Sequence, residues 1–133
     1  MELVAIGAVE SPLTDRGAAP KQGDEGAPEA WLVFDARVAE GLDGIAVGDE
    51  LLVLTWLDRA RRDVLRVHPR GDAARAVQGV FNTRSPARPN PLGLHRVTVV
   101  CIEGTRVAVR DLEALDGTPI VDVKPLLRSV DER

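Results

Sequence analysis

Short apolar runs separated by turn signals, with almost no helical periodicity, are the feature that most constrains the fold of this chain. Residues 49–57 form a near-continuous apolar run of strand length, a pattern that indicates burial on both faces. Residues 96–103 and 105–112 are typical of a hairpin that turns at Glu103-Gly104. Closely spaced strands without amphipathic helices between them favour a barrel or a sandwich over strand–helix–strand units. We therefore expect an all-β fold with little helix.

Five further segments complete the predicted strands: residues 2–9, 29–35, 63–68, 78–81 and 118–123. We interpret residues 63–68 as an edge strand, because Val64 interrupts the alternation, and residues 37–44 as one short helical turn. Residues 14–28 are too polar for a core element and predict a long loop. At 133 residues, of which 44% are hydrophobic, the chain has the size of one domain, residues 1–133, with a sizeable core.

The single cysteine, Cys101, lies in an apolar run and predicts a buried, inert thiol. One cysteine excludes an internal disulfide and a zinc site of the Cys₄ or Cys₂His₂ type. The two histidines, His68 and His95, lack helical spacing, so we expect no metal. A signal segment and a membrane-length apolar run are both absent from the sequence, which predicts a cytoplasmic protein with no membrane partner.

Charge is unevenly distributed along the chain. The formal net charge is −4, which taken whole argues against binding to nucleic acid. Residues 59–96, however, carry nine arginines against only Asp63 and Asp72, a local balance of +7 that leaves −11 on the rest. Two interpretations stay open for this segment: a face that contacts phosphates, or a solvated basic loop.

Residues 79–94 combine arginine, asparagine and proline between apolar runs. Pro86, Pro89 and Pro91 each hold the backbone angle φ at about −65° and remove a hydrogen-bond donor, so the loop is stiff before anything binds. Each side chain that binding must immobilise costs about 0.5–1.5 kcal/mol, and a preordered loop avoids part of that cost. The candidate ligand contacts on this loop are Arg84, Arg88 and Asn90.

A second polar segment covers residues 111–125. It contains Asp116-Gly117, a tight turn in which glycine takes a positive φ and the Asp116 carboxylate is left to form hydrogen bonds. The simpler alternative is a plain turn in which Asp116 bonds its own backbone. Lys124 is either solvated or faces an anionic substrate. For His95, a hydrogen-bonded structural role is favoured over a positioned acid or base.

Taken together, these segments resemble the TsaA-like, or TrmO, family. The resemblance covers nearly the whole chain and rests on motifs in that family's order: Ile6-Gly7, Ser11-Pro12, Pro20-Lys21-Gln22, residues 79–94, Leu115-Asp116-Gly117-Thr118-Pro119 and Asp122-Val123-Lys124-Pro125. It implies a small single-domain β-barrel with long loops, often dimeric, that binds S-adenosylmethionine. Known members methylate the exocyclic nitrogen of N6-threonylcarbamoyladenosine beside the tRNA anticodon, which implies tRNA as the partner.

The same resemblance implies the site residues. The expected cofactor contacts are Pro20, Lys21, Gln22, Asp58, Arg59, Arg84, Leu94, Leu115, Asp116, Gly117 and Thr118. The expected substrate contacts are Arg88, Asn90 and Lys124. An arginine would meet the cofactor's carboxylate and Asp116 its ribose hydroxyls, whereas no residue is assigned to catalysis.

The chain also departs from the family pattern. Asp49 and Glu50 stand where the family usually carries a Ser-His pair, and the histidine expected near Asp58 is absent. Strand placement favours a core role over base stacking for all four aromatic residues: Trp31, Phe34, Trp56 and Phe81. Two alternatives to a tRNA methyltransferase therefore stay open. One is a methyltransferase for a small metabolite, favoured by the acidic pI, and the other is a non-catalytic S-adenosylmethionine-binding module.

Overall fold

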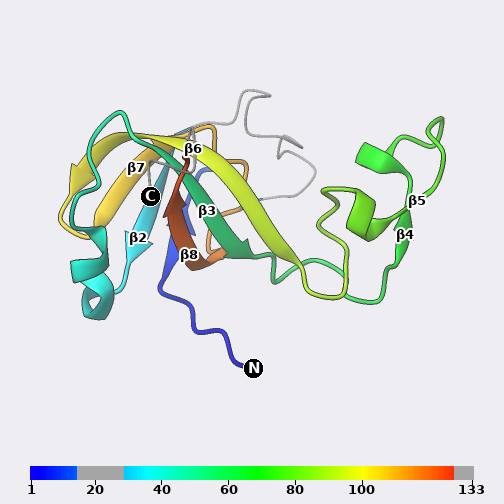
Figure 1. Cartoon of the computed structure of the whole chain (residues 1–133), viewed down its shortest axis with the longest axis horizontal. Coiled ribbons are helices and arrows are strands. Elements are labelled where there is room, and N and C mark those ends of the chain that lie inside the picture. Colours follow the sequence, from blue (N-terminus) through cyan, green and yellow to red (C-terminus); the bar gives the residue numbers. More distant parts are fainter. Residues whose placement is uncertain (15–28, 128–133) are drawn as a thin grey trace.

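The computed structural model describes residues 1–14 and 29–127, in which six antiparallel strands close into a barrel (Figure 1). The order around the barrel is β1-β2-β7-β6-β3-β8, and β8 pairs with β1 to complete the ring. The strands are β1 (Gly7–Glu10), β2 (Ala30–Phe34), β3 (Glu50–Trp56), β6 (Leu92–Glu103), β7 (Arg106–Arg110) and β8 (Pro119–Pro125). Closure removes the exposed edges that an open sheet would present. The all-β prediction is confirmed, and the barrel is the correct alternative.

Strand β6 shows the alternation that builds the barrel. His95, Val97 and Val99 point to the interior and are buried, whereas Leu94 and Arg96 between them are exposed, as the two-residue period of a strand requires. Every barrel strand contributes to the core in the same way. The core consists of Val9, Ala30, Leu32, Phe34, Leu51, Val53, Val97, Val99, Val107, Val109, Leu112, Ala114 and Ile120.

The predicted strands become barrel strands with shifted ends. β6 begins at Leu92, four residues before the predicted start, because Leu92 and Leu94 pair with Trp56 and Leu54 of β3. β1 begins only at Gly7, so the first residues of the predicted strand lie outside the barrel. In place of the predicted helical turn at 37–44 stands a 3₁₀ helix, η2 (Ala36–Leu42).

Residues 57–91 form an arm that stands at one end of the molecule's long axis, away from most of the barrel (Figure 1). The predicted strands at 63–68 and 78–81 shrink here to β4 (Arg66–Val67) and β5 (Gln78–Gly79), which pair with each other and not with the barrel. Two short 3₁₀ helices, η3 (Pro69–Gly71) and η4 (Val80–Asn82), complete the arm. The arginine-rich segment of the sequence is thus mostly this arm.

Gly7 lies where β1 approaches β2 most closely. A Cβ atom there would overlap the backbone oxygen of Val33 and lie 2.9 Å from the Cα of Phe34. Because both are backbone atoms of a paired strand, we expect Gly7→Ala to lower the free energy of unfolding by about 1–3 kcal/mol in urea titrations. Gly41→Ala in η2 is the control, since its added Cβ would meet nothing within 4 Å. Equal losses in the two variants would contradict this close approach.

Candidate functional site

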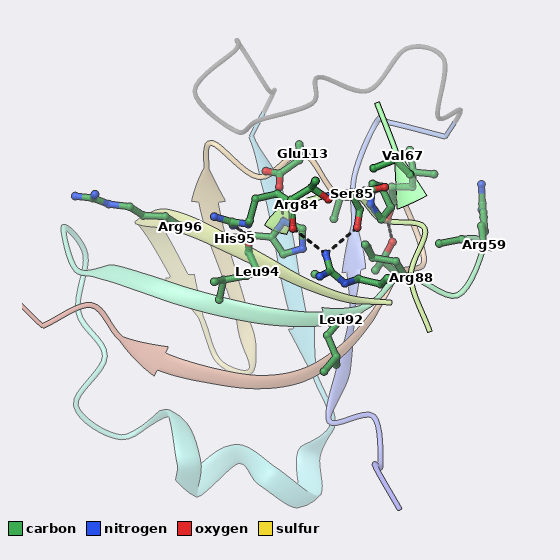
Figure 2. A pocket seen from close by; sticks show the side chains of 18 of the residues that line it. Arg59, Val67, Arg84, Ser85, Arg88, Leu92, Leu94, His95, Arg96 and Glu113 are labelled. Carbon is green, nitrogen blue, oxygen red and sulfur yellow. Dashed lines mark hydrogen bonds and ion pairs between the residues drawn. The ribbon is translucent and has the colours of Figure 1, made fainter. Parts of the chain in front are cut away.

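A cleft of about 1130 Å³ opens beside the first half of β6 (Figure 2). Its other walls are residues 57–60 after β3, two parts of the arm within residues 67–71 and 82–88, and five residues between β7 and β8: Asp111, Glu113, Ala114, Leu115 and Thr118. These segments meet because β6 pairs with β3 on one side and with β7 on the other. The proline-rich loop and the Asp-Gly-Thr turn, which lie far apart in the sequence, are therefore neighbours at one cavity.

His95 lies in the cleft wall with both ring nitrogens engaged. Its Nε2 is 2.6 Å from the Oγ1 of Thr55, and its Nδ1 is 2.6 Å from the Oε1 of Glu113. The ring is only 5% exposed and Thr55 is fully buried. Gly93 makes room for this arrangement, because a Cβ atom at that position would overlap Thr55 Oγ1 and lie 2.7 Å from His95 Nε2. The hydrogen-bonded environment that the sequence favours for His95 is confirmed.

Arg84 is an exposed cation at this cleft. Its Nη2 donates a 2.8 Å hydrogen bond to the backbone oxygen of Leu94, which fixes the guanidinium beside β6 (Figure 2). Arg59, across the cleft, similarly donates to the backbone oxygen of Thr14. A neutral carbonyl leaves the positive charge of each guanidinium uncompensated, so both can attract an anionic ligand group.

Arg88 lines the same cleft but holds the loop together. Its Nη1 donates to the backbone oxygens of Thr83 and Ser85, at 3.1 and 3.0 Å, and its Nη2 donates to that of Val80 at 2.9 Å. The side chain is partly buried. The stiffness of this loop therefore comes from a guanidinium bound to three carbonyls as well as from its prolines.

Other arginines of the basic segment are matched by carboxylates. Arg61 and Asp63 form an exposed ion pair at 2.8 Å, and their side-chain hydrogen bond lowers the pKa of the Asp63 carboxyl. Arg96 on β6 pairs at 2.7 Å with Glu50 of the adjacent β3. The local balance of +7 thus overstates the charge that is available to a ligand.

The turn at 115–118 anchors the end of β1. The backbone nitrogens of Asp116 and Gly117 donate to the oxygens of Leu13 and Val9, and Asp116 Oδ1 accepts from the Ser11 nitrogen at 2.9 Å. Gly117 has the expected positive φ of 83°. Asp116 thus bonds a distant segment and not its own backbone, so the plain-turn alternative is wrong in that detail.

The structure brings seven of the predicted site residues together around the cleft: Asp58, Arg59, Arg84, Arg88, Leu94, Leu115 and Thr118. Asp116 and Gly117 lie in the same turn as Leu115 but are not part of the cleft wall. Pro20, Lys21 and Gln22 lie outside the described residues.

Asn90 and Lys124 do not lie at this cleft. Asn90 Oδ1 accepts from Arg62 at 3.1 Å and borders a separate groove of about 460 Å³ beside Trp56. Lys124 is exposed on β8 opposite Leu52, and its Nζ lies 3.8 Å from Asp122. Neither side chain lines the cleft, and their contacts with a substrate stay predictions.

Sequence reasoning missed two features of the site. Glu113 was not singled out, because its partner His95 is 18 residues away and only the β6–β7 pairing brings them together. Phe81 was predicted as a core residue but is 79% exposed on the arm. Phe34 is buried as expected. Trp31 and Trp56 are half-buried, each beneath an arginine guanidinium.

Metal-binding clusters and membrane-spanning helices were both sought in residues 1–14 and 29–127, the part of the chain that the structure describes. There, no three His, Cys, Asp or Glu side chains are grouped so that they could hold a metal ion. Among the same residues, no helix has the length and apolar character needed to cross a membrane.

Fold and site together define a small β-barrel domain with an arginine-bearing cleft that is large enough for a small-molecule ligand. The family model of the tRNA-methyltransferase O N-terminal domain matches residues 8–132, and the chain therefore belongs to the TrmO family.

Relatives with curated names agree with this membership. An S-adenosyl-L-methionine-binding protein of Archaeoglobus fulgidus is 43% identical over 132 residues, which cover 98% of this chain and 93% of that protein. A probable S-adenosyl-L-methionine-binding protein of Methanothermobacter thermautotrophicus is 42% identical, covering 95% of this chain and 90% of that one. A crystal structure of TrmO from Pseudomonas aeruginosa superposes with a TM-score of 0.75 at 25% identity. That match covers all of this chain but only 60% of the solved one.

Substitutions of Arg88 test whether its guanidinium orders the loop. Removing its guanidinium leaves three backbone oxygens without their donor, and each such loss costs about 1–3 kcal/mol where the group is buried. We expect Arg88→Ala to speed hydrogen exchange of amides in residues 80–88. Arg88→Lys should behave almost as Arg88→Ala, because one ammonium group cannot reproduce the planar fork of donors. Arg61→Ala is the control, since it removes an exposed side chain outside the cleft. Full protection in Arg88→Lys would contradict a geometric role.

Proposed function

We propose that this chain is an S-adenosylmethionine-dependent methyltransferase whose cofactor binds in the cleft beside β6. The observation that carries this proposal is the convergence of Arg84 with residues 111–118 on one cavity. Those are the segments that carry the family resemblance. Relatives with more than 40% identity over almost the full chain are named for binding this cofactor, which supports the same assignment.

The cleft has the chemistry that S-adenosylmethionine requires. Arg59 and Arg84 offer guanidinium donors to a carboxylate. Asp58 offers carboxylate oxygens to ribose hydroxyls or to a positive charge, and Leu115 offers apolar surface to an adenine ring. When bound, the cofactor supplies an activated methyl group on its sulfonium. The residues that line the cleft act by holding donor and acceptor in line, and positioning of this kind contributes up to about 7–11 kcal/mol in model systems.

We further propose that the acceptor is the exocyclic nitrogen of N6-threonylcarbamoyladenosine in tRNA, modified in the cytoplasm. Family membership and the basic arm beside the cleft support a tRNA acceptor. On the arm, Phe81 and Leu65 are exposed, 79% and 62% respectively, among these arginines. An exposed aromatic ring on an arginine-rich arm is a suitable platform for an unpaired base.

We also propose a homodimer. Leu92 and Leu94 on the outer face of β6 are each 41% exposed, and Leu92 borders the groove that Leu3, Trp56 and Val121 line. An apolar surface of this kind beside the cleft is suited to association with a second copy. Analytical ultracentrifugation would test it, because a monomer at all concentrations contradicts the proposal.

Cofactor binding predicts the effect of Arg84→Ala. A hydrogen bond to a charged group contributes about 1.5–3 kcal/mol, so we expect the Kd for S-adenosylmethionine to rise at least ~10-fold in isothermal titration calorimetry. Arg61→Ala serves as the matched control, since Arg61 is outside the cleft and paired with Asp63. Unchanged affinity in Arg84→Ala would contradict cofactor binding in this cleft.

RNA binding predicts the effect of Phe81→Ala. Loss of one stacked base costs about 1–3 kcal/mol, which should appear as weaker tRNA binding with unaltered S-adenosylmethionine affinity. Leu65→Ala removes an exposed aliphatic side chain from the same arm and should leave tRNA affinity nearly the same. Fluorescence anisotropy at several salt concentrations also tests the arginines, because phosphate contacts make affinity fall steeply with salt. Equal affinity for Phe81→Ala and the unaltered protein would contradict the stacking role.

A small-metabolite acceptor is the second candidate, favoured by the formal net charge of −4. Mass spectrometry of tRNA nucleosides from a strain that lacks the gene separates the two. Loss of methylated threonylcarbamoyladenosine supports the tRNA acceptor. An intact pool favours the metabolite, and a protein that binds S-adenosylmethionine but never releases S-adenosylhomocysteine is a binding module.

A further inference from the structure

We propose that Glu113 is the group that accepts the proton during methyl transfer, and that His95 is a positioning residue that holds the Glu113 carboxylate. The proposal rests on the function proposed above and assigns a step within it. It is carried by the Thr55–His95–Glu113 chain of hydrogen bonds, which starts in the barrel interior and ends at the cleft. Figure 2 shows His95 and Glu113 at the cleft.

When the Glu113 carboxylate is ionised and the His95 ring is neutral, the hydrogen-bond chain has one consistent arrangement of protons. An ionised carboxylate can only accept, so the proton on His95 lies on Nδ1 and is donated to Glu113 Oε1. Nε2 then accepts from the hydroxyl of Thr55. Because each ring nitrogen has a partner at 2.6 Å, the imidazole cannot rotate without breaking both bonds. The ring therefore presents a fixed donor to the carboxylate.

The backbone around Glu113 is fixed as well. Leu112 and Ala114 on either side are buried in the barrel core, at 0% and 4% exposure. Asp111 just before them has a φ of 70°, a left-handed conformation that turns the chain out of β7. The Glu113 side chain itself retains 19% exposure and lines the cleft. A carboxylate held at one oxygen, on a fixed backbone, and open to a ligand cavity is arranged to take a proton from a bound molecule.

The proposed reaction needs such a group. An exocyclic N–H of a nucleobase loses its proton when the nitrogen becomes methylated. In the proposed step the Glu113 carboxylate takes that proton while the nitrogen lone pair forms the new N–C bond. The electron pair of the breaking C–S bond goes to sulfur, so S-adenosylhomocysteine leaves uncharged. Glu113 afterwards releases its proton to water and is ionised for the next turnover.

Two other carboxylates at the cleft, Glu50 and Asp58, are less suited to this role. Glu50 Oε2 already accepts two hydrogen bonds from Arg96, at 3.1 and 2.7 Å. Asp58 is exposed and lies on the connection that follows β3. Glu113 is paired with an imidazole, which donates a hydrogen bond without a full positive charge when the ring is neutral.

The first test uses Glu113→Gln, which keeps the shape and loses the proton acceptor. We expect kcat to fall at least ~100-fold, the lower range for general-base catalysis, with the calorimetric Kd for S-adenosylmethionine within about 2-fold. Glu113→Asp should retain part of the activity, and Glu103→Gln, on the hairpin turn far along β6, should retain all of it. Full activity of Glu113→Gln, or a loss in Asp58→Asn alone, would overturn the proposal. If the wild-type protein methylates no acceptor, that result would instead contradict the proposed function and, with it, this step.

The second test separates positioning from general packing at His95. The amide nitrogen of His95→Asn lies near the former Nδ1 and can still donate to Glu113, whereas that of His95→Gln lies near Nε2 and reaches Thr55 instead. We expect kcat of the Asn variant to exceed that of the Gln variant by about 10-fold, with similar KM for the acceptor. Equal kcat values would overturn the positioning role.

A third measurement needs no turnover. The chain has only two histidines, so ¹⁵N spectra of the ring nitrogens are simple, and His68→Gln identifies the signals of His95. We expect the Nδ1–H tautomer of His95 in the unaltered protein and a changed Nδ1 shift in Glu113→Gln. A ring protonated on Nε2 alone would overturn the proposed arrangement.

Discussion

The pairing of β3 with β6 is the constraint on which the site depends. Seven consecutive residue pairs, from Glu50 with Thr98 to Trp56 with Leu92, fix the register. This register turns Thr55 and His95 to the same interior face and leaves Leu94 outside. Because side chains alternate along a strand, a slip by one residue would turn His95 out to solvent and bring Leu94 into the barrel. His95 could then no longer link Thr55 to Glu113 by hydrogen bonds, and the backbone oxygen of Leu94 that accepts from Arg84 would be displaced.

Two arginines four residues apart show how the same side chain serves opposite purposes. Arg88 donates three hydrogen bonds to backbone oxygens of its own loop, whereas Arg84 donates one hydrogen bond to the strand beside it. The first arrangement orders the loop, and the second leaves donors and charge for a ligand. Prolines alone could not do this, because they restrict φ but leave carbonyl oxygens unsatisfied. The guanidinium of Arg88 thus orders the loop that carries Arg84.

The sequence was informative where a local pattern determines structure. Alternation and apolar runs located every barrel strand, and the Glu103-Gly104 turn located the hairpin, because these features depend on neighbouring residues. The sequence was less informative about which side chains meet. Lys124 follows the turn at 115–118 by only a few residues, yet it lies on the outer face of β8, and Glu113 meets His95 only through strand pairing. Phe81 belongs to an apolar stretch that leaves the barrel, so its hydrophobicity gave no sign of its exposure.

The barrel architecture also explains why loop side chains must carry the charge of a ligand. Many nucleotide sites place the anionic group at the N-terminus of a long helix, where backbone N–H groups and the helix dipole receive it. Every helix in the described part of this chain is a 3₁₀ helix of seven residues or fewer. Helices this short cannot provide the dipole of a long helix. The interior of a closed barrel is filled by core side chains, and the cleft lies where loops approach β6. Affinity then depends on how well those loops are ordered, and the hydrogen bonds of Arg88 and Asp116 help to order them.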